Sequence, residues 1–114
     1  MGVVEVLVLI SSFSFFSYGV AYFTSSKMKE EFIRFGLAKY GTLTAVLEIL
    51  GALGLLIGLA FTPLLVFSAG GLSLLMLLGV AVRIRIKDSW LVIVPAFSFF
   101  VLNAYLFYVG INLL

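Results

Sequence analysis

Glu48 is the one ionisable residue within Thr44–Gly58, which lies in the most apolar part of the chain. A carboxylate among aliphatic side chains and lipid is costly, so it pairs with a cation, stays protonated or serves a function such as ligand binding. Gly51, Gly54 and Gly58 follow it on neighbouring helical faces, and glycines of this kind let another helix approach closely. We therefore expect Glu48 to face the interior of a helical bundle.

Lys27 and Arg83 are the cations that we expect near Glu48. Lys27 follows the first hydrophobic run, Arg83 follows the third, and Gly79 lies one turn before Arg83. Glu48 lies about six residues inside its own run, which is roughly 9–10 Å along a helix axis. We predict a Lys27–Glu48–Arg83 network at the cytoplasmic end of the bundle. Two interpretations stay open, namely a structural ion network that fixes helix register and a ligand or proton site.

Further residues are predicted to line a pocket associated with this network. They are polar or small residues of three of the hydrophobic runs: Tyr18, Tyr22, Thr44, Gly51 and Asn103. Asn103 lies in the middle of the last run, where a hydrogen bond to another helix is the commoner role and contact with a ligand is the alternative. Tyrosines near span ends are also typical of the aromatic belt, which is the alternative interpretation of Tyr18 and Tyr22.

The chain contains no cysteine and no histidine in 114 residues. Thiol–disulfide chemistry and thiolate metal sites are thereby excluded, and the usual ligand of haem and transition metals is missing. We therefore predict no catalytic residue, no metal site and no covalently bound cofactor. The protein is more readily interpreted as a binding or structural protein than as an enzyme.

The composition indicates an integral membrane protein. Hydrophobic residues make up 64% of the chain and charged residues only 11%, whereas about a quarter of the residues of a soluble domain are charged. A spanning helix needs about 20 apolar residues, and four such runs are present. The predicted fold class is all-α, with residues 1–114 forming a single domain, a four-helix transmembrane bundle. The predicted spans are residues 3–24, 42–60, 64–82 and 90–113.

Residues 26–39 predict a short amphipathic helix on the membrane surface, between the first and second spans. Met28, Phe32 and Phe35 recur there at helical spacing, and charged residues occupy most of the remaining positions. Ser26 is a suitable N-cap for this helix. An ordinary loop is the alternative.

The placement of basic residues predicts the topology. All seven Lys and Arg residues lie in two connections, residues 25–41 and 83–89, and the N-terminus, the turn at Pro63 and the C-terminus contain none. Basic residues in short loops mark the cytoplasmic side of a membrane. We therefore predict that loops 25–41 and 83–89 are cytoplasmic and that both termini are outside.

An ordered set of motifs in this chain resembles the DoxX-like family of small four-helix integral membrane proteins. The resemblance covers most of the chain, and two of the family positions are Lys27 and Glu48. The motifs are Ser25-Ser26-Lys27-Met28, Glu31-Phe32, Phe35-Gly36-Leu37, Leu47-Glu48-Ile49-Leu50-Gly51-Ala52-Leu53-Gly54-Leu55, Pro63, Ala69-Gly70-Gly71-Leu72 and Arg83-Ile84-Arg85-Ile86-Lys87-Asp88 ahead of Pro95.

The resemblance implies a role near quinone chemistry in a prokaryotic-type plasma (inner) membrane. Members of the family are described as small subunits of quinol- or thiosulfate:quinone-type oxidoreductase systems, or as accessory proteins of membrane redox complexes. The missing Cys and His argue against direct electron transfer by this chain. We predict a non-catalytic module that binds a quinone or a lipid.

The predicted partners are membrane lipid, subunits of a redox complex and a second copy of the chain, and no nucleic acid. Two alternative functions are a proton-coupled small-molecule transporter and a purely structural membrane assembly protein. The transporter is disfavoured because four-span exporters of the small multidrug-resistance type carry their acid in the first span, whereas Glu48 is in the second.

Overall fold

The computed structural model describes residues 2–34, 36 and 38–113. Within this part of the chain every regular element is helical, so the predicted all-α fold is confirmed. The elements are α1 (Val3–Thr24), α2 (Ser26–Arg34), the 3-10 helix η1 (Ala38–Tyr40), α3 (Gly41–Gly58), α4 (Thr62–Arg85) and α5 (Trp90–Leu113).

Within the described residues, four helices are long and apolar enough to cross a membrane, namely α1, α3, α4 and α5. A helix suits this environment because it satisfies its backbone hydrogen bonds internally. α4 begins at Thr62 with Pro63 in its first turn, where the missing N–H of proline costs nothing. It extends past residue 82 to Arg85, so Arg83 lies on its last turn.

The amphipathic helix α2 ends at Arg34, before the predicted end of the surface helix at residue 39. The 3-10 helix η1 follows and leads into α3. Phe35 and Leu37, which belong to the sequence motif of this segment, lie outside the described residues.

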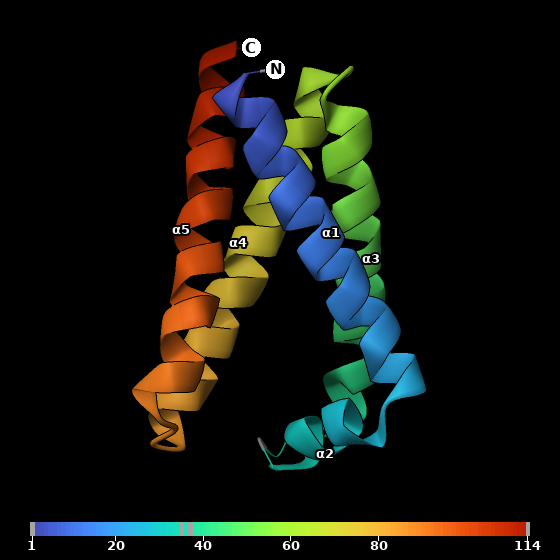
Figure 1. The fold of residues 1–114 in the computed structure, drawn as a ribbon, viewed down its shortest axis with the longest axis vertical. Helices are drawn as coiled ribbons and strands as arrows, with labels where there is room; N and C mark the ends of the chain where they lie inside the picture. Colours follow the sequence, from blue (N-terminus) through green and yellow to red (C-terminus); the bar gives the residue numbers. More distant parts are fainter. Residues whose placement is uncertain (1, 35, 37, 114) are drawn as a thin grey trace.

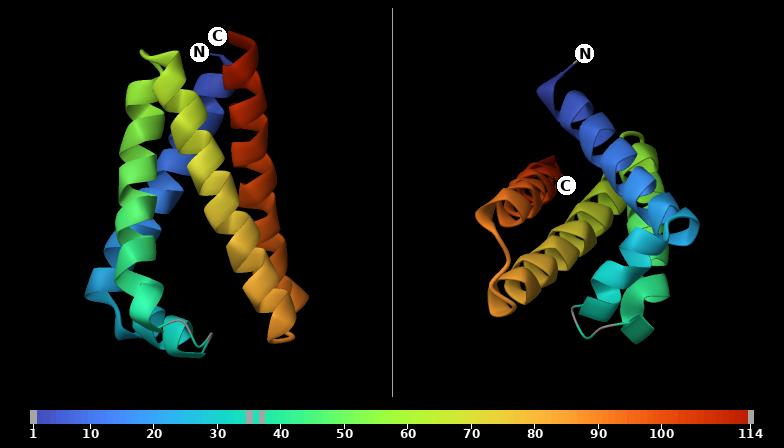
Figure 2. Two further views of the ribbon diagram at one scale, coloured as in Figure 1. Left: turned by 180° about the vertical axis from the view of Figure 1, so that it is seen from behind. Right: turned by 60° about the horizontal axis from the view of Figure 1, so that its bottom comes forward.

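The four long helices form two closely packed pairs, α1 with α3 and α4 with α5, and α3 packs on α4 between them. Both termini and the α3–α4 turn lie at one end of the bundle (Figure 1). The pairs diverge toward the other end, which carries α2 and the α4–α5 connection (Figures 1 and 2). We call this the α2 end. Both basic connections therefore lie at the same end of the bundle.

The hydrophobic core joins all four long helices. Its buried members are Val8, Phe15, Ala52, Leu55, Leu65, Ala69, Leu72 and Leu106. Glycine is required where α3 and α4 come together near their turn, because a Cβ at Gly58 would lie 2.6 Å from the Cα of Leu65. This close approach is the kind that small residues allow between membrane helices.

Candidate functional site

Glu48 lies on the side of α3 that faces the other helices. Ala45 and Ala52, three and four positions away along the same helical stripe, are buried, and Gly41 and Leu55 extend this buried stripe. Glu48 itself is half-buried. Along α3, Glu48 is closer to Gly41, at the α2 end, than to Gly58, beside the α3–α4 turn.

The structure does not join the three predicted network residues through ion pairs. Arg83 Nη1 lies 2.8 Å from Asp88 Oδ2 and 3.9 Å from Glu31 Oε2. Among the described residues, Glu48 forms no ion pair with Lys27 or Arg83. The physical reason is that Asp88, in the connection directly after α4, lies close to Arg83, whereas α4 diverges from α3 toward this end (Figure 1). A ligand-binding role for the predicted residues stays a prediction.

Glu31, Arg34, Arg83 and Asp88 form an ion cluster that joins α2 to the α4–α5 connection, and we call it the α2 cluster. Arg34 Nη2 lies 2.7 Å from Glu31 Oε2 and 3.1 Å from Asp88 Oδ2. The Asp88 side chain is only 13% exposed. Hydrogen bonds from Arg34 and then Arg83 hold the pKa of Asp88 below its ordinary value, against the opposing effect of desolvation.

Sequence reasoning missed the α2 cluster, although it contains a recognisable local signal. Glu31 and Arg34 are three positions apart, which places them side by side on a helix. Arg83, on the last turn of α4, and Asp88, in the connection that follows, are only five positions apart. No spacing rule connects the two pairs, because Arg34 and Asp88 are 54 positions apart.

Tyr22 is buried where α1, α2 and α3 meet. Its ring makes an edge-to-face contact with Phe32, with centroids 5.6 Å apart, and a Cβ at Gly41 would collide with its hydroxyl-bearing edge. The residue thus packs α2 against the ends of two spans. Tyr18, one turn earlier, is exposed on α1.

Thr44 and Gly51 lie on α3 at different heights. The Thr44 hydroxyl donates a hydrogen bond to the Tyr40 carbonyl oxygen at 2.8 Å. Gly51 lies against α4, where a Cβ would meet the Leu72 side chain. These two residues serve the start of α3 and its packing on α4.

Asn103, on α5, is fully buried where α5 packs against α1. Ser11 Oγ donates a hydrogen bond to Asn103 Oδ1 at 2.8 Å, and Asn103 Nδ2 donates to the Phe99 carbonyl oxygen at 2.8 Å. The nearby Ser12 hydroxyl donates to the Ala52 carbonyl oxygen at 3.1 Å, which links α1 to α3. The hydrogen bond between helices, one of the two predicted roles of Asn103, is thus present in the structure.

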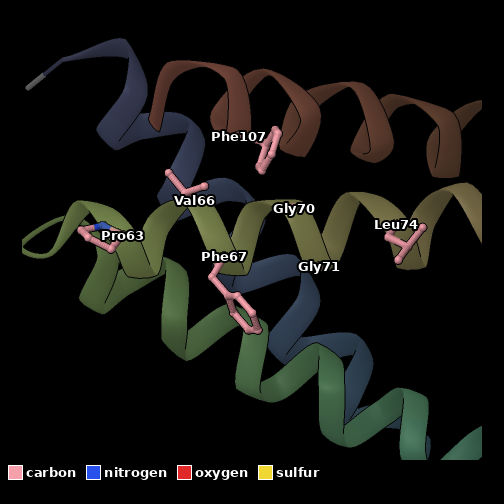
Figure 3. Close-up of a pocket in the computed structure, with 7 residues that line it drawn as sticks. All are labelled: Pro63, Val66, Phe67, Gly70, Gly71, Leu74 and Phe107. Carbon is pink, nitrogen blue, oxygen red and sulfur yellow. The ribbon is translucent and has the colours of Figure 1, made fainter. Parts of the chain in front are cut away.

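An open apolar groove of about 450 Å³ lies on α4 beside α5, away from Glu48. Figure 3 shows Phe107 from α5 above the Gly70–Gly71 step, while Phe67 extends on the other side of α4. No ionisable side chain lines the groove, so it offers no charged group to a ligand. Its lining residues are Pro63, Val66, Phe67, Gly70, Gly71, Leu74 and Phe107.

Among the described residues, no three His, Cys, Asp or Glu side chains gather in a way that could hold a metal ion. The groups that could bind a ligand or a proton are the inward-facing Glu48 carboxyl within the spans and the charged side chains at the α2 end.

Comparison with known proteins places the chain in a family. The model of the DoxX-like family matches residues 6–105. No curated protein and no solved structure matches the chain. The matched segment runs from α1 into α5 and includes Glu48 and the whole α2 cluster. Because the match covers most of the sequence and the structure has four apolar helices, the chain is a small integral membrane protein that belongs to the DoxX-like family.

Proposed function

We propose that this protein is a non-catalytic module of a quinone-linked membrane redox system, and that it binds a quinone or a similar amphiphilic lipid through Glu48. The observation that carries the proposal is the position of this carboxyl. Glu48 is half-buried on the inward side of a membrane-spanning helix, and within the described residues it has no ion-pair partner. Ionisable residues in such positions are functional candidates by default.

The chemistry of a carboxyl group suits this ligand class. A protonated carboxyl donates one hydrogen bond, which a quinone carbonyl oxygen accepts, and a carboxylate accepts hydrogen bonds from the hydroxyl groups of a quinol. Aliphatic residues before and after Glu48 on α3 provide an apolar surface for a ring or an isoprenoid tail. The pair Arg83–Asp88 supports this assignment, because the Arg83 guanidinium is engaged with other carboxylates.

The proposed orientation follows from charge placement, and the proposed membrane follows from the resemblance to the DoxX-like family. We place the protein in the plasma (inner) membrane, with the α2 end in the cytoplasm and both termini outside. All seven Lys and Arg residues lie in α2, η1 and the last turn and connection after α4, and short basic loops remain on the cytoplasmic side. Redox-complex subunits that share the membrane, or a second copy of the chain, are the proposed protein partners.

The test is mass spectrometry of small molecules extracted from gently purified protein, comparing wild type with Glu48→Gln. We expect a stoichiometric quinone or lipid in wild type and its loss in the variant, because the neutral amide of glutamine cannot form the strong, charge-assisted hydrogen bond that a carboxylate accepts from a quinol hydroxyl group. Glu5→Gln is the matched control, because Glu5 is an exposed carboxylate near the opposite end of the bundle. Equal retention by wild type and Glu48→Gln, or no retained molecule in a stable wild type, would contradict the proposal.

A further inference from the structure

The seven cations of the chain divide into two groups at the α2 end. Arg34 and Arg83 belong to the α2 cluster, where Glu31 and Asp88 neutralise them. The other cations are exposed, and in the described part of the chain none of them lies within ion-pair distance of a carboxylate. This second group consists of Lys27, Lys29, Lys39, Arg85 and Lys87.

The α2 end therefore carries a local excess of positive charge. It has seven cations, two of which lie on the last turn of α4, against three carboxylates, which are Glu30, Glu31 and Asp88. Two of these carboxylates are engaged in the α2 cluster, so they do little to offset the exposed lysines. A surface of this kind attracts an anionic partner.

Three of the exposed lysines lie on one connection, between the end of α1 at Thr24 and the start of α3 at Gly41. Lys29 Nζ lies 5.8 Å from the centre of the Tyr22 ring, and Lys39 Nζ lies 5.0 Å from the centre of the Tyr40 ring. Attraction to the aromatic faces holds both ammonium groups close to the ends of the spans. This is the depth at which phospholipid headgroups lie in a bilayer.

We propose that Lys27, Lys29 and Lys39 form a binding surface for the headgroups of acidic phospholipids. The charge is of the right sign, the lysines are exposed, and α2 lies across the ends of the spans rather than extending away from them (Figure 1). The Arg34–Asp88 ion pair supports this geometry because it holds the far end of α2 to the α4–α5 connection. The surface uses other residues than Glu48 and is independent of the proposed quinone site.

The size of the effect follows from the charge on each lysine. A basic residue near an anionic membrane surface contributes about a fivefold preference for anionic over neutral lipid. The contributions of the three lysines are expected to add only in part. Together they should give a preference for anionic over neutral lipid of at least about tenfold. This preference decreases with ionic strength because exposed charges are screened.

Native mass spectrometry tests the proposal on the full chain. The purified protein is equilibrated in mild detergent with equal amounts of phosphatidylglycerol and phosphatidylcholine of the same acyl composition, and the retained lipids are counted. We expect wild type to retain phosphatidylglycerol in at least about tenfold excess. The triple variant Lys27→Gln, Lys29→Gln, Lys39→Gln is expected to lose most of this excess, while the triple variant with Arg at these positions keeps it.

Two controls distinguish loss of lipid binding from loss of folding and from binding of a free anion. Circular dichroism establishes that both triple variants have wild-type helix content, and the three single Gln variants replace the triple if it is not folded. An unchanged preference in folded Gln variants, or no preference in wild type, would overturn the proposal. Inorganic phosphate at millimolar concentration is expected to leave lipid retention unchanged, and full displacement by phosphate would show a free-anion site instead of a headgroup surface.

Discussion

Arg34 donates hydrogen bonds to both carboxylate oxygens of Asp88, from Nη1 to Oδ1 at 3.4 Å and from Nη2 to Oδ2 at 3.1 Å. This bidentate ion pair joins α2, which follows the α1 span, to the connection between α4 and α5. It lies at the end where the two pairs of long helices diverge (Figures 1 and 2). Charged side chains thus link halves of the bundle whose spans separate there.

Replacing Asp88 with Asn is expected to release α2 from the α4–α5 connection. Asn keeps the size of the side chain but removes the charge that Arg34 and Arg83 share. The chain has no native cysteine, so spin labels at Ile33→Cys and Leu91→Cys, both exposed positions, report the distance across this contact. The distance distribution should broaden and shift to longer values in Asp88→Asn. Glu30→Gln removes a carboxylate of α2 outside the α2 cluster and should leave the distribution unchanged.

The same contact should depend on pH with a defined sign. Arg34 and Arg83 lower the pKa of Asp88 in the folded protein, so the ionised form stabilises the contact above the ordinary carboxyl pKa of about 3.9. This stabilisation decreases as the pH falls below that value toward the lower pKa of the folded state. The spin-label distance should stay constant between about pH 8 and pH 5 and lengthen only in stronger acid. A transition near neutral pH would show that another group controls the contact.

Removing the Ser11 hydroxyl should destabilise the bundle interior. Ser11→Ala leaves Asn103 Oδ1 without its donor in a fully buried position. Side-chain hydrogen bonds between membrane helices contribute about 0.6 kcal/mol on average and up to about 1.7 kcal/mol, and a loss in this range is expected in unfolding titrations with a denaturing detergent. Ser98→Ala is the control, because the Ser98 hydroxyl bonds only within its own helix at an exposed position. Equal stability of the two variants would assign Asn103 no role in joining α1 and α5.

Two glycine-to-alanine substitutions should differ clearly in their effect on stability. At Gly58 a Cβ would press against the backbone of Leu65, so Gly58→Ala forces α3 and α4 apart and should cost about 1–3 kcal/mol. At Gly71 a Cβ meets nothing within 4 Å, so Gly71→Ala should be neutral or stabilise α4 by up to about 1 kcal/mol through helix propensity. The same unfolding titration measures both variants. A mild effect at Gly58 would mean that the α3–α4 turn adapts easily.

The helices of this protein were largely determined by its sequence alone. Long apolar runs in lipid must satisfy their backbone hydrogen bonds internally, so the ends of α1 and α5 could be predicted directly. The even number of spans between the two basic connections also required both to lie at one end. The predicted third span ends at residue 82, before the charged residues, whereas α4 continues to Arg85.

Only the tertiary structure decided which polar groups meet. Charge attraction has little directional preference, so the sequence does not define which carboxylate Arg83 contacts. Glu48 was predicted as its partner only because the two residues lie near the same end of their spans. The divergence of α4 from α3 and the placement of α2 instead bring Arg83 to Asp88 and Glu31. Likewise, Asn103 was a recognisable candidate for a hydrogen bond between helices, but its donor Ser11 is 92 positions away. Such contacts depend on how the helices cross, and the crossing is set by side-chain packing of the whole core.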